Sequence, residues 1–517
     1  SAPAAAAAPL AGLVALGSIA TWPGLKEPPP ATLLAPYAAE VLRLPENISG
    51  FLVFAALISL ALAVVAALRL QCGRDLSEPL AGLYAIAATV PMLLALVLAY
   101  LRVTQFDRSI PFALIALVEV GLFYAAARQF NAMPVPQRTP ATHLATGAFL
   151  AAAAAAFCLA LVMVLERGYL TVAFALTAFT TATIATQMRL PLLRWIVVAI
   201  GALVLGRLAW DPRIMGDGVG SWPILNWLLL GYGVPAAAFL AAARTLRSDR
   251  DDLAARLCDA LGLVFAALLG LFQIRHMLHG GDILAPASDH VEQGLVAFMS
   301  LAFAYVLTRL DLGRRNIIFR AASYISAIIA AEVVLLGLGL LDNPLFDGAP
   351  VKGPVVFSSL MLAYLLPGLA AVVLARTARG VRPLWYVTGA AMLAIVLLFG
   401  YATLEVRHVF QGEYIGFLRS TSSAELWAYS ASWLSLGLVF LGYGVVRGSR
   451  EARLASAALV ILSVLKVFLF DLSGVTGLWR ALSFICLGAV LIGIGLVYQR
   501  LIFAKPSGKD EATPTSG

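Results

Sequence analysis

The sequence predicts an all-α fold, a polytopic transmembrane helical bundle of about sixteen helices in tandem parallel four-helix repeats. Hydrophobic residues make up 61% of the 517 residues, charged residues make up only 12%, and the mean hydropathy is +0.91. A soluble protein needs more polar surface than this, so lipid must surround most of the chain. Apolar runs of about twenty residues recur, for example at 51–70 and 223–243, and each is long enough to cross a hydrocarbon core of ~30 Å.

Hydropathy defines the expected helices in order, because Pro, Gly and charged residues separate one apolar run from the next. The first residues, 1–9, have the composition of an Ala/Pro linker and lack the basic start of a signal peptide. We expect helices near residues 10–22, 51–70, 79–101, 110–130, 142–165, 168–186, 191–210, 223–245, 254–278, 290–309, 316–341, 354–377, 382–408, 424–446, 453–472 and 480–503.

Charged residues predict the orientation of these helices. Lys and Arg are concentrated in one of the two sets of connecting loops, including residues 244–250 and 309–315, whereas Asp and Glu favour the other set. The positive-inside bias places the basic loops and the C-terminus in the cytoplasm. The net charge of +8 therefore reflects topology, and membrane lipids rather than nucleic acid are the expected partners.

A repeating spacing of acidic and basic residues suggests an internal duplication. Four glutamates at expected outward helix starts are each followed by an arginine 28 positions later, namely Glu46, Glu166, Glu292 and Glu425 by Arg74, Arg194, Arg320 and Arg453. The motif QIRHMLHG at 273–280 returns as EVRHVFQG at 405–412, and Tyr232 and Pro235 return as Tyr364 and Pro367. We therefore divide the chain into 1–46 (linker, first helix and outward loop), repeats 46–165, 166–291 and 292–424, a partial repeat 425–503, and a disordered cytoplasmic tail 504–517.

Several motifs give the chain a family likeness. The C-terminal segments LKVFLFDLSG at 465–474, GLWRALSF at 477–484 and GIGLVYQR at 493–500 resemble the signature of the bacterial predicted membrane proteins of the DUF2339 family, and NWLLLGYGVP at 226–235, LEVRHVFQG at 404–412 and YSASW at 429–433 support the likeness. The resemblance covers at least residues 166–503 and implies a multi-pass protein of the bacterial inner membrane. It implies no substrate. Family members typically carry a soluble N-terminal part, so we expect this sequence to be the membrane portion of a longer precursor.

The candidate site residues lie at outward helix ends. They are Arg275, His276, His279, Glu292, Arg407, His408 and Glu425. Such a group could bind an anionic headgroup or a sugar, or supply acid and base groups. The alternative is structural, with Arg275 paired to Glu292 and Arg407 paired to Glu425 at the membrane interface. The pair His276 and His279 lacks a defined third ligand, so no metal is expected, and no motif indicates a cofactor or catalytic residues.

Three ionisable residues fall inside expected spans, where a charge is costly without a partner or water. They are Glu119, Glu332 and Lys466. Glu332 and Lys466 stand at similar depths in consecutive repeats, which suggests either a structural bridge or part of a proton or substrate pathway. Pro235 and Pro367 interrupt helical hydrogen bonding, either as packed kinks or as broken helices that line a cavity. We interpret Arg74, Arg194, Arg320 and Arg453 as anchors that reach cytoplasmic headgroups.

Three functions fit these observations. The first is binding or translocation of a lipid-linked or cell-envelope substrate through an outward-facing cavity. The second is a membrane scaffold or assembly subunit for partner proteins, and the third is a membrane-embedded transferase. A water-filled cavity at Glu332, Lys466 or Arg407 would favour the first or third, and a packed interior would favour the scaffold.

Overall fold

The computed structural model describes residues 2–24, 43–72, 76–132, 139–165, 167–210, 219–220, 222–285 and 289–468, together with 485, 487–489, 491–493 and 495–496. Regular structure in these ranges is helical, apart from an isolated bridge between Gly24 and Pro45. Among the described residues, 13 helices are long and apolar enough to cross a membrane. A shorter apolar stretch, Ala7–Ala20, forms most of the first helix. The predicted all-α polytopic class is confirmed. The predicted tail and most of the predicted helix 480–503 lie outside the described residues.

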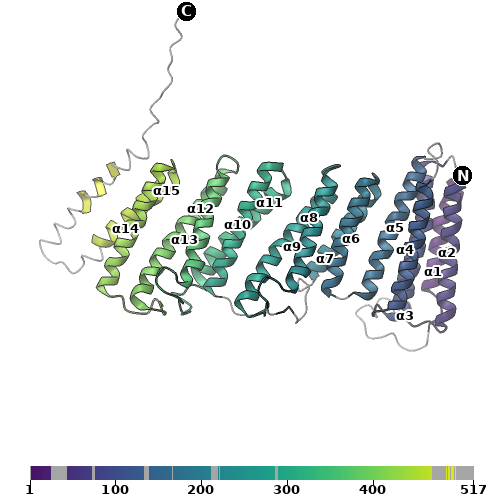
Figure 1. Cartoon of the computed structure of the whole chain (residues 1–517), viewed down its shortest axis with the longest axis horizontal. Coiled ribbons are helices and arrows are strands. Elements are labelled where there is room, and N and C mark those ends of the chain that lie inside the picture. Colours follow the sequence, from purple (N-terminus) through teal and green to yellow (C-terminus); the bar gives the residue numbers. More distant parts are fainter. Residues whose placement is uncertain are drawn as a thin grey trace, which may run out of the picture. The chain divides into compact units, whose positions relative to one another are not determined.

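The chain divides into two compact units, Ser1–Leu269 and Gly270–Gly517. Figure 1 labels the helices. The first unit contains α1 (Ala2–Ala20), α2 (Ile48–Cys72), α3 (Glu78–Thr104), α4 (Ile110–Asn131), α5 (Pro140–Val164), α6 (Arg167–Gln187), α7 (Pro191–Trp210), the π-helical segment η2 (Leu229–Gly233), α8 (Val234–Arg247) and the first part of α9 (Leu253–Leu278). The second contains the end of α9, α10 (His290–Arg314), α11 (Ile317–Glu332), η3 (Val333–Leu341), η4 (Met361–Leu365), α12 (Leu366–Ala378), α13 (Leu384–Gln411), α14 (Ser423–Val446) and α15 (Arg450–Lys466).

Alanine-rich surfaces hold the first unit together. Ala81, Ala85 and Ala88 of α3 are buried in a core cluster with Ala145 and Ala152 of α5. Small side chains let helices approach closely, which matters in lipid because apolar side chains gain little by leaving hydrocarbon. α1 begins at Ala2, so the segment 1–9 is not the linker that its composition predicted. Alanine has the highest intrinsic helix propensity, and the helix continues through Pro9.

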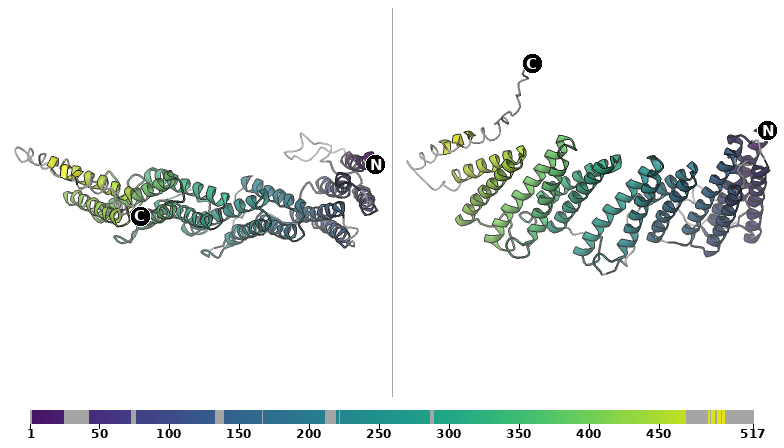
Figure 2. Two further views of the ribbon diagram at one scale, coloured as in Figure 1. Left: turned by 90° about the horizontal axis from the view of Figure 1, so that it is seen from above. Right: turned by 45° about the horizontal axis from the view of Figure 1, so that its top comes forward.

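The second unit has a core of its own, formed by α10 to α13 with η3 and η4. Leu301, Leu338, Tyr364, Leu374 and Leu397 are among its buried residues. α12 and α13 lie side by side, as do α14 and α15, in the views of Figure 2. This pairing of helices that are neighbours in the sequence follows from their short connections.

Pro235 and Pro367 each follow a π-helical segment. Pro235 lies in the first turn of α8 directly after η2, and Pro367 lies in the first turn of α12 directly after η4. A π-helical turn changes the i to i−4 bonding pattern, so the proline, which has no N–H, is accommodated there. The tyrosines of these segments, Tyr232 and Tyr364, are buried, and the Tyr364 hydroxyl donates to the Leu338 carbonyl at 2.9 Å. These segments are packed against the core, as the kink interpretation expected.

Two predicted helices start later than hydropathy indicated. Residues 222–226 and 353–358 are bends, and the helices begin at Trp227 and Ser359. Gly353 and Val356 have φ angles of 100° and 73°. The Glu405 carboxylate also accepts hydrogen bonds from the Val356 N–H at 2.6 Å and from the Ser358 hydroxyl at 2.8 Å. Specific polar contacts therefore override the apolar pattern there.

Candidate functional site

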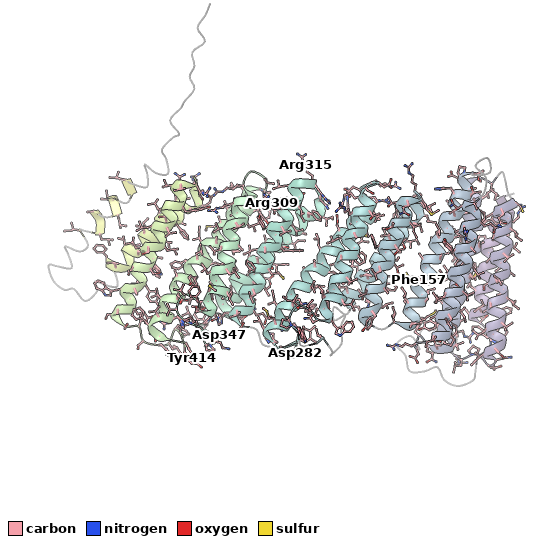
Figure 3. All side chains as sticks on the ribbon, in the orientation of Figure 1. Phe157, Asp282, Arg309, Arg315, Asp347 and Tyr414 are labelled. Atoms are coloured by element: carbon pink, nitrogen blue, oxygen red, sulfur yellow. The ribbon has the colours of Figure 1, made fainter. Side chains whose placement is uncertain are left out.

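Three loops of the second unit meet at one end of its helices. Their described residues are 279–285 with 289, 342–358, and 412–422, which we call the loop cap. In Figure 3, Asp282, Asp347 and Tyr414 mark this end, whereas Arg309 and Arg315 mark the opposite end. Backbone bonds join the second and third loops, from Val351 N–H to the Glu413 carbonyl at 2.7 Å and from Phe417 N–H to the Leu345 carbonyl at 3.0 Å.

Arg407 and Glu425 form the most buried ion pair of the loop cap. The Arg407 Nη1 lies 3.0 Å from the Glu425 Oε1, and their side chains are 8% and 0% exposed. Arg407 also donates through Nε to the Ile415 carbonyl at 2.6 Å and through Nη2 to the Gly416 and Arg419 carbonyls at 2.7 and 3.1 Å. The guanidinium therefore ties the third loop to α13 and to the start of α14.

Arg275 and Glu292 form the corresponding pair between α9 and α10. The Arg275 Nη1 lies 2.5 Å from the Glu292 Oε1, and the His279 Nε2 lies 2.8 Å from the Glu292 Oε2. Arg275 also donates to the carbonyls of Ile283 and Ala285 in the first loop. The two ion pairs of the structural alternative are present, and each arginine also binds carbonyl groups of the adjacent loop.

Helix capping places both glutamates. Asp289 accepts a hydrogen bond from the Glu292 N–H at 2.8 Å, and Ser422 accepts one from the Glu425 N–H at 3.2 Å. Each glutamate therefore lies in the first turn of its helix, where the partial positive charge of the helix end favours a carboxylate. In each pair, the cap fixes the backbone of the glutamate, and the helix dipole stabilises the carboxylate that binds the arginine.

The histidines are placed by the same loops. His408 Nδ1 lies 3.0 Å from the Gly412 carbonyl, and its Nε2 lies 3.2 Å from the Gly353 carbonyl. His290, at the start of α10, lies 2.8 Å from the Ser359 hydroxyl. His276 is 3% exposed on α9. No group of three or more His, Cys, Asp or Glu side chains that could hold a metal occurs among the described residues.

The buried polar groups of the loop cap bind one another and stabilise the loops. All three nitrogens of the Arg407 guanidinium donate to protein oxygens, and both oxygens of Glu425 accept hydrogen bonds, from Arg407, Gln411 and Tyr429. All five Arg407 N–H donors are used within the protein, and the Glu425 side chain is fully buried, so neither group is open to a ligand. Arg275, His279 and Glu292 are less enclosed, because the Arg275 and His279 side chains are 21% and 20% exposed.

The predicted intramembrane charges are separate from one another. Lys466 donates to the Leu426 carbonyl at 2.6 Å and to the Ser430 hydroxyl at 2.8 Å, both on α14. Glu332 is exposed at the end of α11 and forms no ion pair within the described residues, so the predicted Glu332–Lys466 bridge is wrong. Glu119 is 6% exposed on α4, and its Oε2 has no hydrogen-bond partner among the described residues. Their similar expected depth did not bring Glu332 and Lys466 together.

The predicted basic anchors differ from one another. Arg194 is 4% exposed, so it does not reach headgroups as predicted. It binds Asp249 at 3.1 Å and Asp252 at 2.5 Å, and it donates to the carbonyls of Leu246 in the last turn of α8 and of Arg250 in the loop after it. Arg320 is half-exposed and lies 3.2 Å from Asp311, whereas Arg74 lies outside the described residues.

Two buried arginines were missed from the sequence. Arg102 of α3 is fully buried, donates to the Ile19 and Ala20 carbonyls that end α1, and donates to the Arg43 carbonyl. Arg382 is buried and lies 2.7 Å from Asp311. Both arginines stand at the edge of an apolar run, where a sequence pattern does not distinguish a buried arginine from one that reaches water.

The comparisons with known proteins identify one family. A family model described as Predicted membrane protein (DUF2339) matches residues 8–501. No curated protein and no solved structure matches the chain.

Proposed function

We propose that this chain, which belongs to the DUF2339 family of predicted membrane proteins, is a membrane scaffold whose loop cap binds partner proteins. The observation that carries this proposal is the paired state of the loop cap. Arg407 and Glu425 direct their hydrogen bonds to each other and to nearby protein groups, which fixes the third loop and leaves no open charged site at this pair. A rigid surface is what a binding platform needs, because fewer degrees of freedom are lost on association.

Exposed apolar side chains on the loop cap support this role. Phe346, Phe357, Phe417 and Leu418 are 56%, 71%, 60% and 88% exposed, and the rings of Phe346 and Phe417 contact each other edge to face. Exposed apolar groups that lie close together at a fixed place on a protein are typical of contact surfaces. The polar pairs beneath them would hold these side chains in position.

We further propose that the protein lies in the bacterial inner membrane, with the loop cap facing outward and the C-terminus in the cytoplasm. The basic residues Arg309 and Arg315 lie at the end opposite the loop cap, and lysine and arginine favour the cytoplasmic side. We also infer that the four-helix segments are tandem repeats. Two equivalent features support this inference: π-helical segments before Pro235 and Pro367, and loop-binding arginines at 275 and 407.

Site-specific photo-crosslinking in cells tests the scaffold. A photoreactive amino acid at Phe357 or Leu418 should yield discrete crosslinked proteins, whereas the same group at Arg309, at the other end of the unit, should not yield those proteins. If the loop-cap positions gave only lipid adducts or uncrosslinked protein, the proposed platform would be wrong.

Handling of a lipid-linked or envelope substrate is a second candidate, favoured by the partial exposure of Arg275 and His279 beside Glu292. An anionic headgroup that reached this group would compete with Glu292 for the arginine. Native mass spectrometry of the protein with an envelope lipid extract should then reveal a retained anionic species that Arg275→Gln abolishes. Equal adducts in the parent and the variant would leave the scaffold as the better assignment.

A further inference from the structure

A cavity of ≈ 350 Å³ lies among α12, α13, α14 and α15 in the second unit. Most of its lining is apolar, with Leu369, Val373, Ala391, Ile395 and Phe440 among the side chains. These helices, with the exception of the short α15, rank among the candidate membrane spans, so the solvent around the cavity is lipid. An acyl chain is the ligand that such a lining accepts from a bilayer.

One end of the cavity carries charge. Arg376 and Arg379 of the last turn and C-terminus of α12 line it, together with Tyr443, Ser449 and Glu451. Arg379 Nη2 lies 2.7 Å from the Ser449 hydroxyl and 2.8 Å from the Glu451 Oε2. One carboxylate therefore faces two guanidinium groups, which leaves the end of the cavity positive.

The charge of Arg376 is not neutralised by a carboxylate of the described residues. Its Nε donates to the Tyr443 hydroxyl, a neutral group, and its guanidinium carbon lies 4.6 Å from the centre of the Tyr443 ring. Within the described part of the chain, Arg376 forms no ion pair with a carboxylate. The tyrosine thus holds the guanidinium in place without neutralising it, and the Nη groups remain available to a phosphate oxygen.

The apolar and charged parts of the cavity follow one another along α12. Leu369 and Arg376 are seven residues apart on one helix, which corresponds to about 10 Å along the axis. Arg376 lies in the last turn of α12, a helix that runs away from the loop 342–358, so it stands at the end of the unit opposite the loop cap. The charged end would therefore lie at headgroup level and the apolar end in the hydrocarbon.

A larger cavity in the first unit does not offer this combination. It measures ≈ 530 Å³ and is lined by apolar and threonine side chains from α4 to α7, including Tyr124, Phe157, Thr177 and Leu193. No charged residue lines it, so it has no means of selecting one headgroup over another. Selectivity requires the arginines of the second unit.

We propose that the cavity among α12 to α15 binds an anionic phospholipid of the surrounding bilayer. One acyl chain occupies the apolar part, and the phosphate contacts Arg376 beside the Arg379–Glu451 pair. The guanidinium forms two parallel hydrogen bonds with phosphate oxygens, which favours an anionic headgroup over one whose own ammonium neutralises the phosphate. The site is independent of the loop cap, and its occupancy does not depend on the scaffold role.

Native mass spectrometry of the full chain in detergent, with equal amounts of dioleoylphosphatidylglycerol and dioleoylphosphatidylcholine, tests the proposal. We expect preferential retention of phosphatidylglycerol, and a decrease of about tenfold in its apparent affinity in Arg376→Gln. Arg309→Gln, which removes another exposed arginine at the same end, should leave retention unchanged. Inorganic phosphate in excess should not displace the lipid, because it lacks the acyl chain.

A second pair of variants tests the apolar part. Ala391→Phe places a ring in the cavity and should lower retention of the lipid, whereas Met392→Phe on the neighbouring exposed position should not. Circular dichroism of each variant would establish that its helices are intact. Equal retention of the two lipids, equal effects of Arg376→Gln and Arg309→Gln, displacement by phosphate, or no effect of Ala391→Phe would each overturn the proposal.

Discussion

Gly294 of α10 lies directly against the backbone of Ala363 in η4. A Cβ built on Gly294 would stand 2.2 Å from the Ala363 Cα and 2.7 Å from the Leu362 carbonyl oxygen. Backbone atoms have no alternative rotamer, so neither side could yield without moving a helix. The second unit therefore depends on the absence of a side chain at this position, two residues after the glutamate that binds Arg275.

We predict that Gly294→Ala lowers the free energy of unfolding by about 1–3 kcal/mol, the usual effect of overpacking. Thermal unfolding in detergent, followed by helical circular dichroism, measures the change. Gly313→Ala in the same helix is the matched control, because no atom lies within 4 Å of a Cβ built there. That control should be neutral or stabilising, since alanine favours the helix by about 0.5–1 kcal/mol. Equal effects of the two substitutions would contradict the close approach.

The buried pair of Arg407 and Glu425 gives a second prediction. Glu425→Gln leaves the guanidinium charge buried without its counter-ion, and we expect a loss of about 3–5 kcal/mol in the free energy of unfolding. The double variant Arg407→Met with Glu425→Leu should recover part of this loss, because it removes both charges. Thermal unfolding of the single and double variants gives the coupling between the two sites.

The equivalent substitution Glu292→Gln provides a comparison for this prediction. Arg275 is 21% exposed, so water compensates its charge better than that of Arg407, whose side chain is 8% exposed. The loss at Glu292 should therefore be the smaller one. A loss at Glu425 of only about 0–1 kcal/mol, as for surface pairs, would show that this pair does not hold the loop cap.

Sequence reasoning predicted the spans well because lipid imposes one simple requirement on them. α2, Ile48–Cys72, contains the predicted run 51–70 and needs only length and apolar composition. The segment 354–358 is equally apolar, but Glu405, 47 residues beyond Ser358, binds it as a loop. Hydropathy does not predict a contact between residues that are distant in the sequence, so the start of this helix was predicted too early.

Only part of the candidate site could be predicted from the sequence. Arg275 and Arg407 stood out because each recurred in a shared motif near an acidic residue, and the structure pairs them with Glu292 and Glu425. Their bonds to loop carbonyls were not predictable, because every residue supplies a carbonyl. Glu332 and Lys466 were paired by depth alone, and depth does not fix the direction in which a side chain leaves its helix.

Acid should destabilise the first unit through Asp252. Burial raises the pKa of Asp252, but the hydrogen bonds from Arg194 and the Ala255 N–H and the nearby arginine charges outweigh it, so its pKa lies below the usual value. A carboxylate with a lowered folded-state pKa contributes its full stability above the unfolded-state pKa of ~3.9 and loses it as the pH falls through the folded value.

We therefore predict that Asp252→Asn lowers the apparent Tm at neutral pH and flattens its decline between about pH 5 and pH 2. Asp251→Asn is the control, because the Asp251 side chain is 48% exposed, and its pairs with Arg247 and Arg256 are open to water. Apparent Tm values across this pH range distinguish the two. An acid dependence in Asp252→Asn as steep as in the parent protein would assign the effect to other carboxylates.

The orientation of the second unit gives the last prediction. Tyr414 and Arg309 are exposed at opposite ends of its helices. Lysine and arginine resist translocation, so the Arg309 end should face the cytoplasm and the Tyr414 end the outside. In a parent protein with Cys72, Cys158, Cys258 and Cys486 replaced by serine, a membrane-impermeant maleimide should label Tyr414→Cys in intact cells with a permeable outer membrane.

Arg309→Cys should react with the same reagent only after the inner membrane is opened. Reversed labelling would invert the whole assignment, placing the loop cap in the cytoplasm and the Arg376 end of the α12 to α15 cavity in the outer leaflet. The anionic lipid would then be drawn from the outer leaflet, and the partners of the loop cap would be cytoplasmic proteins. Labelling of both positions in intact cells would mean that the bilayer does not separate these two ends. That result would contradict the assignment of α10 and α13 as membrane-spanning helices, for which both are long enough.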